Sequence, residues 1–225
     1  KPDSKGFFCV STSYRQEPNA IPGRHDIIFP MFEFEMPGTI DDLKAMEYEL
    51  VDYLGFEKPT EKTYAEWQKH YGLAEDYEMT AEEEGKMFDE FTTALITDFP
   101  EFTSPFWNMS RYEDGVHSKK IDVILGGMET IGSAERSTDV DMMRDTFHTI
   151  TDGEYSQLLY KLFGKERVEA ELEKFLEFDF FERVGGGIGM TRMIAALETL
   201  DNDVQVTNGA IAQANLKGLD LHGWE

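Results

Sequence analysis

Along the first 54 residues, the spacing of hydrophobic positions changes from the alternation typical of a strand to the period typical of a helix. Residues 7–14 and 27–36 are rich in aromatic and β-branched side chains, and the segment between them holds two prolines and a glycine, so we predict a long β-hairpin. In the second strand Phe32 and Phe34 fall on one face, and the glutamates that follow each of them fall on the other.

Two helices are predicted to begin at capping boxes. Thr39 is followed three residues later by Asp42, and Thr80 by Glu83, the spacing at which both side chains bond free N–H groups of a first helical turn. The first helix has an apolar stripe of helical period, formed by Ile40, Leu43, Met46, Leu50, Val51 and Leu54. We expect the second helix to end near Pro100.

The rest of the chain mixes short strands and helices. Residues 56–79 are polar and irregular, with weak helical character. Further strands are expected at 104–109, 119–126 and 128–136, and helices at about 138–147, 154–163 and 165–178. A short strand, a glycine run and a helix carrying Met193, Ile194, Leu197 and Leu200 follow. Hairpins dominate and regular βαβ alternation is absent, so the pattern predicts an α+β fold, a mostly antiparallel sheet flanked by helices.

Length and composition suit a single domain over residues 1–225 with a helical insertion at about 56–100. Hydrophobic residues make up 40% of the chain, and no apolar run approaches the roughly 20 residues of a membrane span. The single cysteine, Cys9, fits a reducing compartment, so we expect a cytoplasmic protein without a membrane partner. Because the chain starts at Lys1 without an initiator methionine, we expect a processed or trimmed form.

The net charge of the chain restricts the classes of ligand that we expect it to bind. The chain has 21 basic and 45 acidic residues and a net charge of −24. Nucleic-acid binding depends on lysines and arginines that contact phosphates, so we do not expect extended tRNA or DNA binding. Most of this charge is interpreted as a solubilising surface.

The stretch "RVGGGIGMTR" (183–192) is the first candidate for chemistry. It matches neither the dinucleotide-binding glycine pattern nor the phosphate-binding loop that ends in Lys-Ser/Thr, and alone it is typical of a tightly packed strand-to-helix turn. Arg192 changes this interpretation because it falls on the first turn of the next helix. A helix N-terminus and a guanidinium can both bind an anion, and the guanidinium can also lie flat on a purine ring.

The hairpin supplies a second group of candidates. Arg15 could bind a phosphate, Glu17 the amine edge of a base and Phe29 its ring, with Arg24 and His25 in the loop between the strands. Together they form a coherent ATP site. The alternative is a surface ion pair near a core phenylalanine.

The third group lies in "GGMETIGSAER" (126–136), where small residues separate polar ones. Glu129 could bind Mg²⁺ through oxygen, and Arg136 could hold a carboxylate with two parallel hydrogen bonds. Gly132 and Ser133 would leave space above the sheet. The alternative is an ordinary strand with charges at its edge.

In this order the three groups resemble the catalytic core of class II aminoacyl-tRNA synthetases. Arg15-Gln16-Glu17, the loop and the return strand through Phe29 look like motif 2, and "GGGIGMTRM" looks like motif 3. "KIDVILGGMETIGSAER" is similar to the signature of the aspartate subgroup, and "SPFWNM" to the strand before it. Within the superfamily the chain is most similar to stand-alone, ammonia-dependent asparagine synthetases and their archaeal relatives.

The resemblance implies a role for each matching residue. Arg15 and Arg192 would be the catalytic cations, Phe29 would stack on adenine, Glu129 would hold Mg²⁺ and Arg136 would bind a substrate carboxylate. It also implies ATP-binding positions at Glu17, Arg24, His25, Gly187 and Gly189, and substrate-binding positions at Ser133 and Gly186.

Four features depart from the family pattern. Ile28 stands where the return strand normally has a glutamate, and Gly132 replaces a small hydroxyl residue that often follows the metal-binding acid. The helix and strand of motif 1, which build the family dimer, would precede Lys1, and no anticodon-binding domain is visible.

The leading hypothesis is an ATP-dependent, AMP-forming ligase. It would activate aspartate or a similar dicarboxylic amino acid as an acyl-adenylate and transfer it to ammonia, with ATP and Mg²⁺ as cofactors and a homodimer as the expected assembly. One alternative is the core of an aspartyl- or asparaginyl-tRNA ligase without its anticodon-binding domain. Another is a non-catalytic paralogue that binds a partner or a metabolite.

Overall fold

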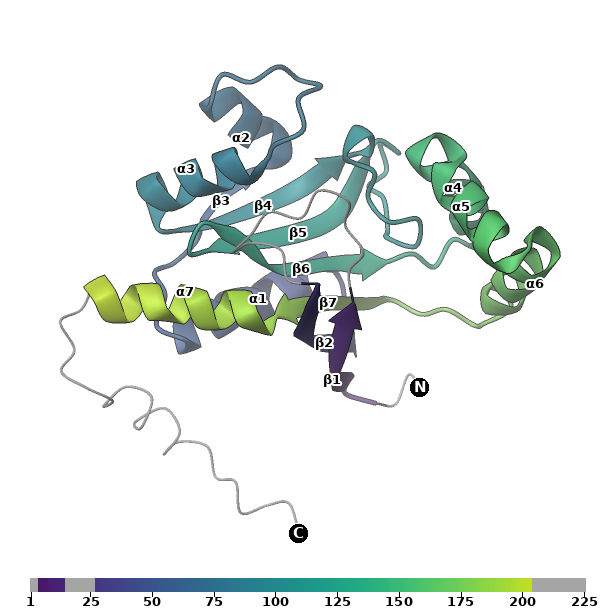
Figure 1. The fold of residues 1–225 in the computed structure, drawn as a ribbon, viewed down its shortest axis with the longest axis horizontal. Coiled ribbons are helices and arrows are strands. Elements are labelled where there is room, and N and C mark those ends of the chain that lie inside the picture. The colour runs from purple at the N-terminus through teal and green to yellow at the C-terminus, as the bar shows by residue number, and fades with distance from the viewer. Residues whose placement is uncertain (1–3, 15–26, 204–225) are drawn as a thin grey trace, which may run out of the picture.

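A single seven-stranded sheet organises the protein (Figure 1). The computed structural model describes residues 4–14 and 27–203. The strand order is β1-β2-β7-β6-β5-β4-β3, and every neighbouring pair is antiparallel except β3 and β4, which are parallel. The strands are β1 (Phe7–Tyr14), β2 (Ile28–Pro37), β3 (Thr60–Thr63), β4 (Thr93–Pro100), β5 (His117–Leu125), β6 (Met128–Arg136) and β7 (Arg183–Gly189). The α+β prediction is confirmed.

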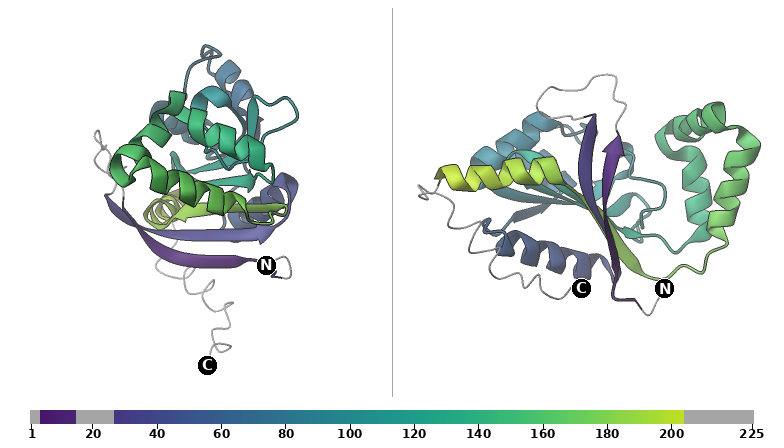
Figure 2. Two further views of the ribbon diagram at one scale, coloured as in Figure 1. Left: turned by 90° about the vertical axis from the view of Figure 1, so that its right-hand side faces the viewer. Right: turned by 60° about the horizontal axis from the view of Figure 1, so that its bottom comes forward.

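Helices cover both faces of this sheet and extend beyond one end of it (Figures 1 and 2). The α-helices are α1 (Ile40–Tyr53), α2 (Tyr64–His70), α3 (Ala81–Phe91), α4 (Val140–Thr149), α5 (Glu154–Phe163), α6 (Lys165–Leu176) and α7 (Met190–Asp203), and short 3₁₀ turns span Glu101–Thr103 and Ile150–Gly153. Among the described residues, no helix has the length and apolar character needed to cross a membrane.

The N-terminal hairpin and both predicted capping boxes are confirmed. At the start of α1, Asp42 Oδ2 accepts a hydrogen bond from the Thr39 N–H at 2.8 Å. At the start of α3, Glu83 Oε2 accepts one from the Thr80 N–H at 2.9 Å. These bonds satisfy N–H groups that a helix cannot pair internally.

The helix that begins after Thr80 is shorter than predicted. It ends at Phe91, Thr92 takes a positive φ of 63°, and β4 follows at once. Pairing with β3 and β5 buries the first five residues of this strand, and such packing outweighs weak local preference. The weakly helical stretch at 56–79 likewise contains β3 and α2, so residues 56–100 contribute both strands and helices.

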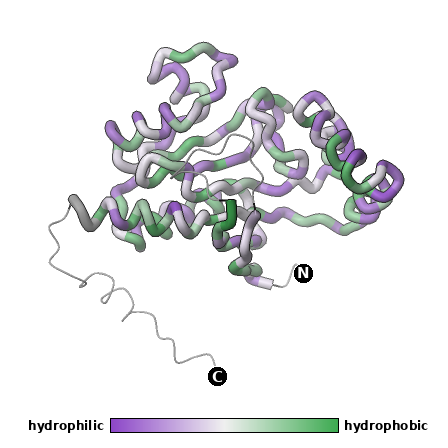
Figure 3. The backbone as a smooth tube through the Cα atoms, in the orientation of Figure 1, coloured by the Kyte–Doolittle hydropathy of each residue, from purple (hydrophilic) through white to green (hydrophobic). Residues whose placement is uncertain are grey.

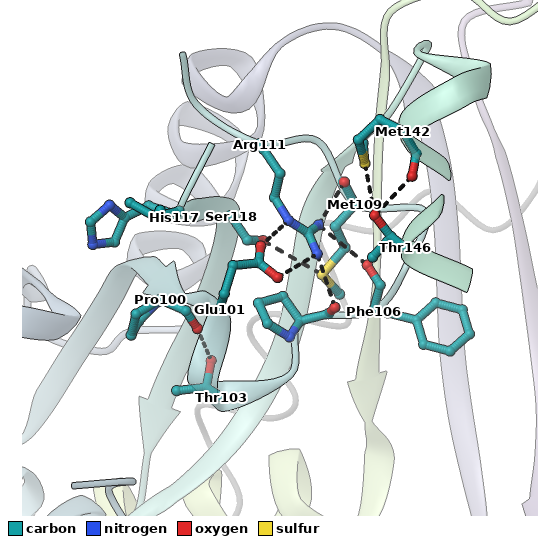
Figure 4. A network of polar contacts seen from close by, with 12 residues as sticks. Pro100, Glu101, Thr103, Phe106, Met109, Arg111, His117, Ser118, Met142 and Thr146 are labelled. Atoms are coloured by element: carbon teal, nitrogen blue, oxygen red, sulfur yellow. Dashed lines mark hydrogen bonds and ion pairs between the residues drawn. The ribbon is translucent and has the colours of Figure 1, made fainter. Parts of the chain in front are cut away.

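The predicted strand at 104–109 is wrong. Met109 forms only an isolated bridge with Arg136. The Arg111 guanidinium instead donates to the carbonyls of Pro105 at 3.2 Å, Phe106 at 3.4 Å and Met109 at 2.7 Å, and it pairs with Glu101 (Figure 4). The hydrogen bonds to Arg111 therefore hold this segment as a compact loop. In addition, Pro105 has no N–H group to donate to a neighbouring strand.

Side chains alternate between two distinct environments across the sheet. On the face covered by α1 and α7, called here the α1 face, apolar residues of five strands join one core. Phe32 and Phe34 of β2 pack against it, as the alternation predicted, and so does Met36. On the opposite face, called the pocket face, α2 and α3 cover β4 and β5 with a second core that includes Trp67 and Met87, and the strands from β6 to β2 carry polar residues and glycines.

The chain between β6 and β7 forms a separate helical unit, α4 to α6, at the end of the sheet (Figure 2). Its helices pack on one another around Met143, Phe147 and Leu172, with Trp107 from the preceding loop. Hydrophilic and hydrophobic residues alternate along these helices (Figure 3), as expected for helices with one buried face.

Candidate functional site

A pocket of about 320 Å³ opens on the pocket face above β2, β7 and β6. This volume lies within the range of small-molecule sites. Its lining is mostly polar or free of side chains and consists of Ser13, Phe29, Met31, Glu33, Glu129, Thr130, Gly132, Arg136, Gly186, Gly187, Gly189, Thr191 and Arg192.

The floor of the pocket is made of glycine backbone. Gly132 of β6 pairs directly with Gly187 of β7, and the same row continues to Glu33 on one side and Asp122 on the other. A Cβ on Gly187 would lie 2.5 Å from Met31 Cε. The glycine run is therefore a central strand, and the missing side chains leave a flat space between two carboxylates.

Glu129 reaches the pocket because the ladder shifts beside it. Arg136 follows it by seven positions, so in a regular strand the two side chains would lie on opposite faces. Between β5 and β6 the register shifts by one residue, since neighbouring Val123 and Ile124 pair with Ile131 and Glu129. This extra residue, Thr130, turns Glu129 to the face of Arg136, as β-bulges commonly do.

Arg192 lies at the start of α7, as predicted, and bonds β6. Its Nη1 donates to the carbonyl oxygen of Glu129 at 2.6 Å and lies 3.8 Å from the carboxylate oxygen Oε2 of the same residue. The guanidinium therefore stands at the helix N-terminus, where the helix dipole also favours an anion.

Asp122 lies beside the glycine floor, and we did not single it out from the sequence. It is buried, its Oδ2 accepts a hydrogen bond from Lys120, and its Oδ1 has no partner. Burial raises the pKa of Asp122 to about 7, although the positive charge of Lys120 acts to lower it, and the negative charge of Glu129 adds to the increase. Its signal was an acid inside the apolar strand "IDVIL", seven residues before Glu129.

Asp122 and Glu129 offer oxygen donors beside the glycine floor. A Cβ on Gly132 would lie 2.6 Å from Glu129 Oε1 and 3.6 Å from Asp122 Oδ1, so both carboxylates border the same space. The unpartnered oxygen of Asp122 fits a hard cation, and Mg²⁺ typically takes one or two carboxylates and completes its shell with water and phosphate. Within the described residues, no group of three or more His, Cys, Asp or Glu side chains forms a metal site.

Arg136 is held by an ion pair at the far end of the pocket. Its Nε donates to Glu35 Oε1 at 2.8 Å, and Arg183 approaches the other oxygen of Glu35 at 3.8 Å. Arg136 and Arg183 are paired residues of β6 and β7, and burial lowers the pKa of Arg183. Glu35 therefore orients two neighbouring arginines, and Arg136 also lines the pocket.

The structure brings most of the described candidates together. Phe29, Glu129, Gly132, Arg136, Gly186, Gly187, Gly189 and Arg192 all line the one pocket. Arg15, Glu17, Arg24 and His25 lie outside the described residues. The roles assigned to all of these residues stay predictions.

Ser133 requires a correction. It lies on the α1 face, where it is 3% exposed and its hydroxyl donates to Glu47 Oε1 at 2.5 Å. Its neighbour Gly132 lines the pocket, so alternation along β6 directs the Ser133 side chain away from the site. From the sequence, we grouped the two residues as small residues of one segment and did not apply this alternation to them.

Glu47 is a second buried acid, on the reverse side of the floor. It is fully buried among the apolar residues of the α1 face, and its Oε2 has no hydrogen-bond partner. Burial raises the pKa of Glu47 to about 8, although the hydrogen bond from Ser133 acts to lower it, and the charge of Asp122 adds to the increase.

Comparisons with known proteins agree with the fold. A family model described as class II tRNA synthetases (D, K and N) matches residues 4–207. No curated protein matches the chain in sequence.

Several solved structures share the fold. Asparaginyl-tRNA synthetase from Pyrococcus horikoshii, complexed with asparaginyl-adenylate, has a TM-score of 0.70 at 18% identity, over 88% of this chain and 50% of that one. Aspartyl-tRNA synthetase from Entamoeba histolytica has a TM-score of 0.68 at 17% identity, over 86% and 45%. Asparaginyl-tRNA synthetase from Entamoeba histolytica, also with asparaginyl-adenylate, has 0.67 at 19%, over 85% and 49%. The chain thus spans about half the length of these proteins.

Proposed function

Because the chain belongs to the class II (D, K and N) tRNA synthetase family, we propose that its pocket activates an amino acid with ATP as an acyl-adenylate and transfers the acyl group to ammonia. The observation that carries the proposal is the convergence of Glu129, Arg136 and Arg192 on one glycine floor. These three side chains would provide an oxygen ligand for a cation, a carboxylate clamp and a phosphate clamp.

The nucleotide would lie along β2 and β7. Phe29 offers a ring for adenine at one side of the pocket, and Gly187 and Gly189 let the ligand approach the backbone closely. Arg192 would bind phosphate or cover the other face of the base, assisted by the N-terminus of α7. Arg15, Glu17, Arg24 and His25 are proposed to complete this half of the site from the hairpin loop.

Glu129 and Asp122 would hold Mg²⁺. When bound, the ion would neutralise negative charge on the ATP phosphates. The residues of the chain then have two tasks, to place the substrate carboxylate in line with the α-phosphorus and to stabilise the charge that develops there.

Arg136 would fix the amino acid for this reaction. A carboxylate oxygen of the substrate attacks the α-phosphorus, a new acyl–phosphate bond forms, and the bond to pyrophosphate breaks. Ammonia then attacks the acyl carbon and AMP leaves. Because Glu35 already orients the Arg136 guanidinium, a second carboxylate on the substrate meets a preorganised partner, which supports aspartate or a similar dicarboxylic amino acid.

The identity of the acceptor separates two proposals. A net charge of −24 favours a small amine over tRNA, because RNA binding needs clustered positive charge. The solved structures with this fold include asparaginyl- and aspartyl-tRNA synthetases, which supports a tRNA ligase core as the second candidate. A homodimer stays a prediction from the family resemblance, and a cytoplasmic location stays a prediction from the single cysteine.

Pyrophosphate exchange tests the activation step without assuming an acceptor. We expect exchange of labelled pyrophosphate into ATP that depends on aspartate or a close analogue, and Arg136→Ala should lower it about 100-fold because a charged hydrogen-bonding partner is lost. Arg144→Ala is the matched control, because Arg144 pairs with Asp141 and Glu173 on the helical unit.

Three outcomes would contradict the proposal or part of it. If pyrophosphate exchange is equal in Arg136→Ala and in the wild type, Arg136 does not bind the substrate carboxylate. If neither exchange nor ATP binding by calorimetry is detected, a non-catalytic paralogue is the better description, in keeping with Ile28 and Gly132. AMP release that requires tRNA and ignores ammonia would select the tRNA ligase core.

A further inference from the structure

A carboxylate of α3 bonds the backbone of β6 where the ladder shifts. Glu84 Oε2 accepts a hydrogen bond from the Glu129 N–H at 2.7 Å, across 45 residues of sequence. This is the residue whose side chain the shift turns into the pocket. The contact therefore lies at the position that decides which face Glu129 occupies.

The helix that carries Glu84 is firmly seated against the β5–β6 turn. Met87 of α3 is fully buried in the second core. At the turn, a Cβ on Gly127 would lie 3.6 Å from Phe88 Cβ and 3.8 Å from Gly85 Cα. Because the helix backbone comes this close to the turn, Glu84 is presented to β6 by a rigid element rather than by a loop.

Glu84 also contributes to the electrostatics of the carboxylate pair. Its charge, together with that of Glu129, acts to raise the pKa of the buried Asp122. Three acids from three elements therefore influence the same space: Asp122 of β5, Glu129 of β6 and Glu84 of α3. Glu84 differs from the other two because its oxygen is bonded to backbone.

We propose that Glu84 is a positioning residue that holds Glu129 on the pocket face through the Glu129 N–H. The positioning itself does not depend on the proposed function, but its consequence for cation binding rests on that function. Groups that orient metal ligands from behind commonly change metal affinity 10- to 100-fold when they are removed. A helix outside the pocket lining would thus govern the geometry of the cation site.

Amide hydrogen exchange tests the positioning in the ligand-free protein. In Glu84→Ala the Glu129 amide should exchange at least about 10-fold faster by NMR, because its acceptor is gone. Glu84→Gln keeps an acceptor oxygen and should stay close to the wild type. Glu82→Ala removes the same charge from an exposed position that pairs with Lys86, and it should leave the Glu129 amide unchanged. Equal protection in Glu84→Ala and the wild type would overturn the proposal.

Mn²⁺ binding, followed by electron paramagnetic resonance in the presence of ATP, tests the consequence. Affinity should fall about 10- to 100-fold in Glu84→Ala and remain near the wild-type value in Glu84→Gln and Glu82→Ala. Unchanged Mn²⁺ affinity in Glu84→Ala would overturn the link to the cation site.

The two measurements separate the proposal from the proposed function. If the wild type binds no Mn²⁺, the metal site of the proposed function fails, while amide exchange still decides whether Glu84 positions Glu129. If Glu84→Ala does not fold, the Glu84→Gln variant provides the test. A Glu129 amide that exchanges in Glu84→Gln as fast as a solvent-exposed amide would contradict the proposal.

Discussion

Two buried acids lie on opposite faces of the central strands, and their surroundings differ in a telling way. Asp122 on the pocket face accepts a hydrogen bond from Lys120 and borders the glycine floor. Glu47 on the α1 face is bonded by the Ser133 hydroxyl and packed among apolar side chains. Each has one oxygen without a partner and a raised pKa.

The comparison teaches that a perturbed carboxyl does not by itself identify a site. Burial is the largest cause of the raised pKa in both residues, but only Asp122 has a second acid, a cation and an open pocket beside it. The proposed role of Asp122 in cation binding and the effect of Glu47 on stability are thus separated by the thickness of one sheet. Three substitutions test this division, one at Glu47 and two at adjacent glycines of β7.

The largest effect is expected at Glu47 and depends on pH. Its pKa is raised from 4.5 to about 8 in the folded protein, so the folded state holds a proton that the unfolded state releases. The stabilisation is complete below pH 4.5 and is lost as the pH rises toward 8, on the order of 4 kcal/mol in total. Glu47→Gln should remove this dependence, and its free energy of unfolding should exceed that of the wild type at pH 8.

Urea unfolding at pH 5, 6.5 and 8 measures this difference. Asp122, with its pKa near 7, contributes a decline of the same sign in both proteins, so the comparison with the wild type isolates Glu47. Glu57→Gln changes an exposed glutamate and should follow the wild-type curve. A Glu47→Gln variant with the wild-type slope would show that Glu47 is ionised in the folded protein.

The second effect is a loss of stability at Gly186. A Cβ there would lie 2.6 Å from Ser133 Cβ and 2.8 Å from the carbonyl oxygen of Gly132, and backbone cannot move aside as a side chain can. Gly186→Ala should therefore lower the free energy of unfolding by about 3 kcal/mol, as for other overpacked sites. Thermal and urea unfolding measure it, and a wild-type midpoint would contradict the packing of β6 on β7.

The smallest change in stability is expected one residue later. A Cβ on Gly187 would meet only the flexible end of Met31, so Gly187→Ala should lower the free energy of unfolding by less than about 1 kcal/mol. The methyl group would instead occupy the pocket floor, and ATP affinity by calorimetry should fall about 10-fold, roughly 1.4 kcal/mol. Unaltered ATP affinity would mean that the nucleotide does not lie on Gly187.

Local signals in the sequence were sufficient for much of this architecture. The hairpin and both capping boxes have short-range causes, and so does the arginine at the start of α7. β4 was missed because its strand character comes from burial between β3 and β5. The prediction of a strand at 104–109 was wrong for a similar reason: carbonyls of this segment accept hydrogen bonds from the Arg111 side chain, a contact that local sequence does not reveal.

The site was predictable in its residues more than in its geometry. Glu129, Arg136 and Arg192 were found from residue type and spacing, and all three line the pocket. The face of Glu129 depends on a one-residue shift between two strands, which leaves no mark in the residues themselves, whereas simple alternation with Gly132 already directs Ser133 away from the pocket. Asp122 had a local signal, an acid inside an apolar strand, whereas Glu84 is identified only by its long-range contact with β6.

The helical unit has a consequence for how this chain can vary. Arg136 and Arg183 are direct partners in the ladder, so the 46 residues between them form, in topological terms, the loop of a β6–β7 hairpin. The loop leaves and re-enters the sheet at adjacent points, and the entropy of closing a loop changes only slowly with its length. The connection is therefore a natural place for the protein to gain, lose or exchange whole helices while the two arginines stay in register.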